Sequence, residues 1–312
     1  MLKIPKISIG LPVYNGEAYL AKAIESILDQ SYPDFELIIS DNASTDRTAE
    51  ICRDFAARDS RIRFFQNRVN IGGARNHNRV FELARGEFFK LAAHDDLYPR
   101  EMLERCLEVF EKGSPSIALV YSYFELIDEF GNCVEVRTDL IEKRDPRAHR
   151  RLARLLLNIG CYSAIYGLIR SELRRKIQQG SFAYSDGVFL AELAMLGEFR
   201  EVKEVLLCLR HHSGQSFGAN RTPDYIRAWF DPQTARKPHA FPLKARADLE
   251  VVRSVLRAPL PLGARILCLL VAVAVPCWLR FRAWSFPLRR RLGLALSVWR
   301  KKDKTLILRI DR

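Results

Sequence analysis

The sequence predicts an α/β fold: a mostly parallel sheet flanked by helices, followed by a helical extension that is both basic and apolar. Three observations predict it. Within residues 1–100, segments of strand length alternate with segments of helical length, as in a parallel sheet covered on both faces. Polar residues follow the ends of these strands. Toward the C-terminus, apolar runs are interleaved with clusters of arginine and lysine.

The first strand and helix are marked by a change of period. Residues 6–13 alternate as in a strand, a turn follows at residues 14–16, and residues 17–30 place apolar side chains on one helical face. The next elements are expected as a strand over 35–40, a helix from a cap at Ser44 or Thr45 to about Ala57, a strand over 62–66, a helix over 73–84 and a buried strand over 88–93.

The polar residues at the strand ends predict a ligand site. Ligands of open parallel sheets bind just beyond the carboxyl ends of the strands. Asp95 and Asp96 follow an apolar run, and two carboxylates there suit a hard divalent cation and, through it, a diphosphate. The alternative is that they cap a helix. Gly72-Gly73 with Arg75 at a helix start suits an anion, and it matches neither a Walker loop nor Gly-x-Gly-x-x-Gly.

Four motifs occur in the order and spacing of family 2 glycosyltransferases, and together they make residues 4–215 resemble that family. They are Val13-Tyr14-Asn15, the run from Ile39 to Asp46, Asn70-x-Gly72-Gly73-Ala74-Arg75-Asn76 and His94-Asp95-Asp96. The resemblance implies a GT-A (Rossmann-like) domain over 1–233, with a nucleotide-sugar half to about residue 100 and an acceptor half after it. Residues 234–312 are expected to form the C-terminal extension.

The resemblance also implies an activity: inverting transfer from a nucleoside-diphosphate sugar, with a UDP-sugar favoured, to a hydroxyl of a glycan or lipid-linked acceptor in polysaccharide biosynthesis. Asp41 is expected to face the base and Tyr14 to stack on it. The alternative makes Asp41 a turn carboxylate bonded to its own backbone. Arg75 resembles the basic residue near the diphosphate. Nucleotide-sugar binding is assigned by matching position to Pro12, Tyr14, Asn15, Asp41, Arg75, Asp95 and Asp96.

The acidic motif departs from the commonest family form, Asp-x-Asp-Asp, because Ala93 holds the first aspartate position and His94 the next. Asp95 matches the carboxylate that coordinates metal, and Asp96 helps through water or shapes the loop. An oxygen-dominated site of this kind favours Mg²⁺ or Mn²⁺.

The catalytic base is expected in the second half. Asp186 matches the family's Glu-Asp segment before an amphipathic helix through Leu196, and Ser185 replaces the glutamate. A first-turn aspartate stabilised by the helix dipole explains the local sequence equally well. His211 and His212 follow a strand-like segment and are tentative metal ligands, of which at most one faces the site. Residues 160–170 resemble the family's acceptor-side strand.

The charge is concentrated at the C-terminus. Residues 257–312 hold 13 Lys/Arg and two Asp, a net of +11 out of the total of +13. The apolar run 266–279 falls short of the ~20 residues of a spanning helix and contains Pro276. Trp278, Trp284 and Trp299, which lie among Arg280, Arg282 and the arginines at 289–291, predict attachment to the inner face of the cell membrane, with the boundary at 234–244 or near Pro259. The alternative is a helix packed on the domain with a solvated basic face.

The remaining features restrict the class of protein. Seven dispersed cysteines without Cys-x-x-Cys predict reduced thiols in the cytoplasm and no zinc site. A strand close to the first residue predicts no signal peptide. Nucleic-acid binding is disfavoured because residues 1–256 are nearly neutral. A non-catalytic nucleotide-sugar-binding relative stays open because Ala93 and Ser185 replace acidic residues. A nucleotidyltransferase would carry a glycine-rich motif with a lysine, which is not found near the N-terminus.

Overall fold

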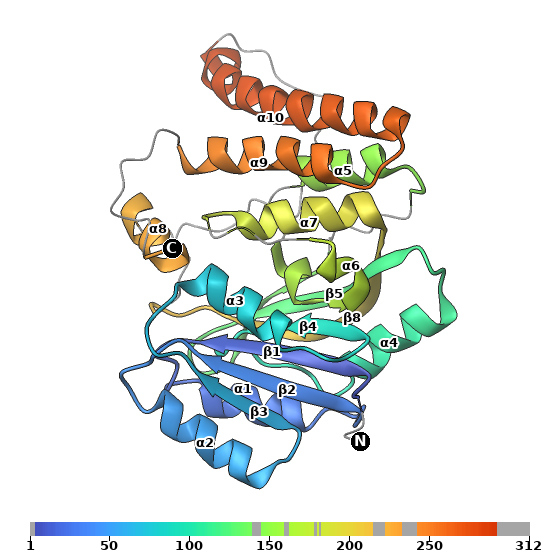
Figure 1. The fold of residues 1–312 in the computed structure, drawn as a ribbon. Helices are drawn as coiled ribbons and strands as arrows, with labels where there is room; N and C mark the ends of the chain where they lie inside the picture. Colours follow the sequence, from blue (N-terminus) through green and yellow to red (C-terminus); the bar gives the residue numbers. More distant parts are fainter. Residues whose placement is uncertain are drawn as a thin grey trace.

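A computed structural model gives the fold of the chain (Figure 1). The structure describes residues 4–138, 145–158, 162–177, 180, 182–214, 222–232 and 242–291. The sequence has 312 residues. The predicted boundary between the transferase domain and the extension, at residues 233 and 234, lies outside the described residues, so this prediction stands as made.

One mixed, mostly parallel eight-stranded sheet forms the centre, in the order β3-β2-β1-β4-β7-β5-β6 with β8 paired to β5. The pairs β1–β2, β1–β4, β2–β3 and β5–β8 are parallel, and β7 and β6 pair antiparallel with their neighbours. The strands are β1 (Ile7–Val13), β2 (Phe35–Asp41), β3 (Ile62–Gln66), β4 (Phe88–Leu91), β5 (Ile117–Ile127), β6 (Cys133–Arg137), β7 (Leu168–Arg170) and β8 (Glu198–Arg210).

Helices cover both faces of the sheet, as predicted. Helices α3, α7, α9 and α10 lie in successive layers above it, and α1 and α2 lie below it (Figure 1). Their bounds are α1 (Leu20–Leu28), α2 (Thr48–Arg58), α3 (Gly73–Glu82), α4 (Met102–Lys112), α5 (Ala148–Leu157), the 3₁₀ turn η1 (Tyr162–Tyr166), α6 (Ser171–Arg175), α7 (Ser185–Leu196), α8 (Pro223–Phe230), α9 (Leu243–Arg257) and α10 (Leu262–Arg291).

Two hydrophobic clusters hold the layers together. One joins β1 and β2 to α1 and α4. The other joins the opposite face of the sheet to α5, α7, α9 and α10. Each fully buried aliphatic side chain in them contributes about 1.5–3 kcal/mol. The sheet is therefore fixed from both sides, and the loops after its strands are held on a rigid base.

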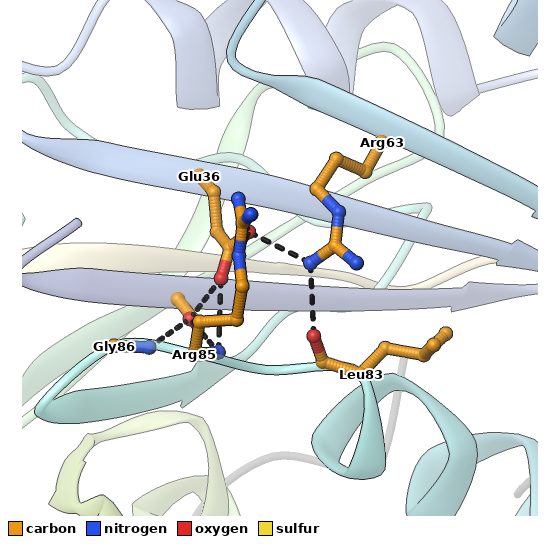
Figure 2. A network of polar contacts seen from close by, with 6 residues as sticks. Glu36, Arg63, Leu83, Arg85 and Gly86 are labelled. Atoms are coloured by element: carbon orange, nitrogen blue, oxygen red, sulfur yellow. Dashed lines mark hydrogen bonds and ion pairs between the residues drawn. The ribbon is translucent and has the colours of Figure 1, made fainter. Parts of the chain in front are cut away.

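A network of charged residues around the buried Glu36 fixes the amino-terminal ends of the parallel strands. Figure 2 shows Glu36 of β2 between the guanidinium groups of Arg63 and Arg85. Glu36 also accepts a hydrogen bond from the Ser8 hydroxyl of β1 at 2.6 Å. Burial alone would raise the pKa of Glu36, but hydrogen bonds from Arg85, Ser8 and Arg63 lower it below its usual value. The network ties β2 to β1, to β3 and to the loop before β4.

Two of the predicted helices differ from expectation. The second starts at Thr48 instead of at a cap on Ser44 or Thr45, because Asp46 Oδ1 accepts the Thr48 N–H at 3.0 Å. The helix after Tyr184 is not amphipathic, since α7 is apolar around most of its circumference and lies inside the second cluster.

Two further predictions also need correction. Of the acceptor-side strand expected over 160–170, only β7 is extended, and η1 precedes it; residues 159–161 lie outside the described residues. The C-terminal apolar run is not cut short at Pro276. Helix α10 continues through it, and its first part, Leu262–Arg280, is long and apolar enough to cross a membrane by length and composition.

Candidate functional site

The ends of β1 and β2 meet at one edge of the sheet. Val13 is paired with Asp41 in the parallel register, so the two following loops lie side by side. The Asn15 N–H donates to Ser44 Oγ, and Asn15 Oδ1 accepts the Thr45 N–H, both at 2.9 Å. Asn15 has a φ of 48°, a left-handed conformation that Asn tolerates better than most residues. These bonds are why Ser44 and Thr45 do not cap α2.

The predicted nucleoside residues divide into exposed and buried ones. Tyr14 is 41% exposed and Asn15 is exposed, so both are accessible to a ligand. Pro12 is buried within β1. Asp41 is fully buried, and its carboxylate accepts hydrogen bonds from the Ser44 N–H and hydroxyl and from Gln66 Nε2. The contacts of Asp41 match the alternative role, a carboxylate that orders the turn.

The loop after β4 meets the end of β8. Asp95 Oδ2 lies 3.0 Å from His212 Nε2, and the two residues are separated by more than a hundred positions in the chain. Arg210 fixes this approach: its N–H donates to Asp96 Oδ1 at 2.9 Å and its Nε donates to the Asp95 carbonyl at 2.8 Å. The ring of Tyr19 packs against the His212 ring and under the Arg210 guanidinium.

The other residues near Asp95 have separate roles. Asp96 is buried and bound to Arg210, and burial together with the adjacent Asp95 charge raises its pKa well above the usual value. Asp96 therefore shapes the loop. His94 lies so close to Gly16 that a Cβ there would meet its ring at 2.5 Å, which makes it a packing residue. His211 is exposed, and of the two tentative histidines His212 is the one that reaches Asp95.

Asp95 and His212 offer a partial metal site. No group of three or more His, Cys, Asp or Glu residues that suits a metal occurs within the described part of the chain. A carboxylate oxygen and an imidazole nitrogen 3.0 Å apart match the spacing of adjacent ligands around an octahedral ion with bonds of about 2.1 Å. The pair therefore fits Mg²⁺ or Mn²⁺ if a substrate diphosphate and water supply the remaining ligands.

Asp186 begins α7 on the acceptor side. Its side chain is partly buried, and Oδ1 has no hydrogen-bond partner within the described structure. Burial raises the pKa of Asp186. The pKa of Tyr166 in η1 is raised well above its usual value by burial and then by the charges of Asp96, Asp95 and Asp186. The candidate base and the candidate metal ligand thus lie around one tyrosine.

Lys90 of β4 is a site-supporting residue that the sequence analysis did not single out. It is 1% exposed, and Nζ donates to the Tyr166 carbonyl at 2.5 Å and lies over the Tyr98 ring. The Tyr98 hydroxyl in turn accepts the Ala93 N–H and donates to the Ala93 carbonyl. Burial lowers the pKa of Lys90 to about 7. In the sequence, the sign of such a residue is a lysine within an otherwise apolar strand.

The glycine motif before α3 is covered by another helix. A Cβ on Gly73 would meet the Trp229 ring of α8 at 2.7 Å, and one on Gly72 would meet the Phe230 carbonyl at 2.5 Å. The close backbone approach predicted from the two glycines is therefore used by α8. Arg75 forms an ion pair with Asp231 at 3.6 Å and lines a cavity of about 560 Å³ between α3, α7 and α9. Asp41, Asp95 and His212 do not line this cavity.

Comparisons with known proteins identify the family. The model of glycosyl transferase family 2 matches residues 8–177, a little over half of the chain. An uncharacterized glycosyltransferase of Haemophilus influenzae is 33% identical over 137 residues, 44% of this chain and 54% of that protein. The chain thus spans about half the length of this curated relative.

Solved structures share the fold. S. aureus TarS 1–349 in complex with UDP-GlcNAc matches 94% of this chain and 76% of its own, with a TM-score of 0.64 and 16% identity. A mannosyltransferase from Pyrobaculum calidifontis in complex with GDP-Man and Mn²⁺ matches 94% of this chain and 77% of its own, with a TM-score of 0.54 and 16% identity. These likenesses confirm the predicted GT-A-type architecture.

Proposed function

This chain belongs to glycosyl transferase family 2, and we propose that it transfers a sugar, with inversion, from a nucleoside-diphosphate sugar to a hydroxyl of a glycan or lipid-linked acceptor. The observation that carries the proposal is the contact between Asp95 and His212 at the carboxyl edge of the sheet. The UDP-sugar and GDP-sugar complexes of the two structural neighbours support this donor class, with UDP favoured.

Donor binding is assigned to the loops after β1, β2 and β4. Tyr14 offers an exposed ring on which a base can stack. Asp95 and His212 would hold Mg²⁺ or Mn²⁺, and the bound ion would stabilise negative charge on the leaving diphosphate. Arg210 holds the Asp95 backbone and Tyr19 packs against the His212 ring, so little freedom of these two residues is lost when the donor binds.

Asp186 is the proposed general base. The acceptor oxygen attacks the anomeric carbon from the face opposite the diphosphate, the bond from that carbon to the diphosphate oxygen breaks, and the acceptor proton passes to the carboxylate. Single displacement of this kind inverts the configuration. A carboxylate whose pKa is raised by burial is a stronger base than an exposed aspartate, and Oδ1 is free to take the proton.

A thermal-shift series tests the donor site. Nucleoside diphosphates are added with and without Mn²⁺ to the wild type and to Asp95→Asn. We expect a metal-dependent rise in Tm for at least one nucleotide in the wild type and its loss in Asp95→Asn. Asn removes the charge at nearly constant shape, so equal nucleotide stabilisation of both proteins would remove Asp95 from the site.

A hydrolysis assay separates transfer from binding. The release of nucleoside diphosphate from the donor that binds is measured with the wild type, with and without candidate glycans and lipid-linked sugars. Turnover supports the transferase. Tight, metal-dependent binding without release across all acceptors would favour the non-catalytic relative instead.

A further inference from the structure

Helix α10 has two apolar faces with different surroundings. One face carries Cys268, Ala272 and Pro276, which are buried at intervals of four residues. Cys268 and Ala272 belong to the same hydrophobic cluster as α5, α7 and α9. Figure 1 shows α10 lying along α9 and α5, as the outermost layer of the molecule. The inner face therefore closes the core of the domain.

The outer face is apolar and exposed over four turns. Its side chains lie along one side of the helix, and between Arg265 and Arg280 the helix carries no charged residue. A contiguous apolar stripe of this length marks an interaction surface. We call it the α10 stripe, and it consists of Leu262, Ile266, Leu267, Leu270, Val273, Cys277 and Trp278.

We propose that the α10 stripe docks the protein on an anionic membrane surface, with α10 lying in the plane of the bilayer. A helix in this orientation keeps its inner face on the domain while its outer face enters the boundary between headgroups and hydrocarbon. Trp278 and Arg280 near the end of the stripe are residue types that prefer this boundary.

The length of α10 also permits a spanning helix, but its contacts oppose one. A spanning helix would have to expose Cys268 and Ala272 to lipid and leave the cluster shared with α5 and α9 uncovered. Two further contacts hold α10 on the domain: Arg280 pairs with Asp248 of α9, and Arg265 donates to the carbonyls of Ala258 and Leu260. The in-plane orientation preserves all of these contacts.

The positive charge of residues 257–312 favours a lipid surface, rather than a second copy of the chain, as the partner of the α10 stripe. Residues 257–312 carry 13 Lys/Arg and two Asp, a net of +11. Two copies of a chain with this charge would repel each other, which would oppose association through the α10 stripe. An anionic bilayer would instead attract them, by about 1 kcal/mol for each basic residue near the surface.

Two exposed cysteines supply a test within the native sequence. Cys277 lies on the α10 stripe and Cys133 lies on β6, so of these two described cysteines Cys277 alone should be covered by lipid. The full-length protein is treated with a water-soluble maleimide, with and without vesicles of phosphatidylglycerol and phosphatidylcholine, and labelling is resolved by peptide mass spectrometry. We expect vesicles to slow labelling of Cys277 by about tenfold and to leave Cys133 within about twofold.

A pair of matched variants tests the same surface by vesicle flotation. Leu270 is 61% exposed on the stripe and Val134 is 68% exposed on β6, so Leu270→Glu and Val134→Glu introduce the same charge at similar exposure. Leu270→Glu should lower partitioning to the anionic vesicles by about tenfold or more, and Val134→Glu should match the wild type.

Three results would overturn the proposal. Equal labelling of Cys277 with and without vesicles would exclude membrane contact. Protection of Cys277 that depends on protein concentration and needs no vesicles would assign the stripe to a second copy. Protein that resists release from membranes by alkaline carbonate and leaves only with detergent would indicate a spanning helix. None of these outcomes depends on sugar transfer.

Discussion

The end of β4 and the start of α3 both carry motifs that the sequence predicts to bind a ligand, but the two motifs have different surroundings in the fold. After β4, Asp95 reaches the His212 side chain at the carboxyl edge of the sheet. At the start of α3, two glycines and Arg75 suit an anion equally well by composition, yet Trp229 and Phe230 of α8 cover the glycines. Arg75 pairs with Asp231, just after the same helix.

The difference shows what a local motif can and cannot decide. Both motifs correctly mark places where backbone or carboxylates come close to another group. Whether that group is a ligand or another helix depends on a segment more than a hundred residues later in the chain: the end of β8 for Asp95 and α8 for the glycines. Arg210 holds the β4 loop against β8, and 18% of the Asp95 side chain and 12% of the His212 side chain stay exposed there.

The strongest test of the candidate active site is Asp186→Asn, which should lower the transfer rate by about 10²–10⁴-fold and leave donor affinity nearly unchanged. Burial raises the pKa of Asp186, so its charged form costs folding free energy at neutral pH. The variant should therefore unfold at a higher temperature than the wild type. Initial rates and thermal denaturation measure the two effects. Normal turnover would refute the assigned base.

Lys90→Met tests, through the pH dependence of stability, the buried lysine that supports the candidate active site. Burial lowers the Lys90 pKa from 10.5 to about 7, so between these values the unfolded chain binds more protons than the folded one. The cost of the buried charge is present in full below pH 7 and is relieved as the pH rises toward 10. As the pH rises over this range, the free energy of unfolding of the wild type should therefore increase relative to that of Lys90→Met, by a few kcal/mol at most.

The measurement is urea denaturation of both proteins at pH 6, 8 and 10. A constant difference between them would show that Lys90 does not titrate on folding. At pH 8 the variant should also lower kcat more than it raises KM, because Lys90 links the Tyr166 backbone to the loop before Asp95.

Gly73→Val tests the covered site. The added side chain would collide with the Trp229 ring, so α8 must shift, and we expect a loss of about 1–3 kcal/mol in the free energy of unfolding. Gly263 is the control, because a Cβ there meets nothing within 4 Å and Gly263→Ala should leave stability nearly unchanged. If Gly73→Val were as stable as the wild type, α8 would not cover the motif.

The smallest effect is expected for Arg75→Gln. Its partner Asp231 is buried, but Arg75 itself is 39% exposed, and a partly exposed pair contributes about 0–1 kcal/mol. Nucleoside diphosphate affinity should change by less than about threefold, as measured by calorimetry. A loss of tenfold or more would place Arg75 at the diphosphate, as the resemblance to the family predicts.

Much of the fold follows from local information. The alternating segments of β1, β2 and β3 and the apolar face of α1 are encoded by neighbouring residues, and their bounds match the predicted ones closely. The length of α10 was underestimated because Pro276 reads as a breaker, although a helix held by tertiary contacts tolerates one missing hydrogen bond.

The site was predictable only in part. Asp95 and Asp186 could be proposed from motifs, and the two adjacent histidines could be narrowed to one by strand geometry. The choice of His212, the support from Tyr19 and Lys90, and the central position of Tyr166 depend on contacts between segments far apart in the chain. Neither the hydrophobic periodicity of the sequence nor its composition predicts such contacts.

The central claim is that the ends of β4 and β8 form one cation–diphosphate site. The most direct measurement is a double-mutant cycle on Mn²⁺-dependent nucleoside diphosphate affinity with Asp95→Asn, His212→Gln and the double variant. If both side chains hold one ion, each single change should remove most of the Mn²⁺ dependence and the double variant should lose little more. Two independent, additive losses, or an unchanged affinity in either single variant, would contradict the account.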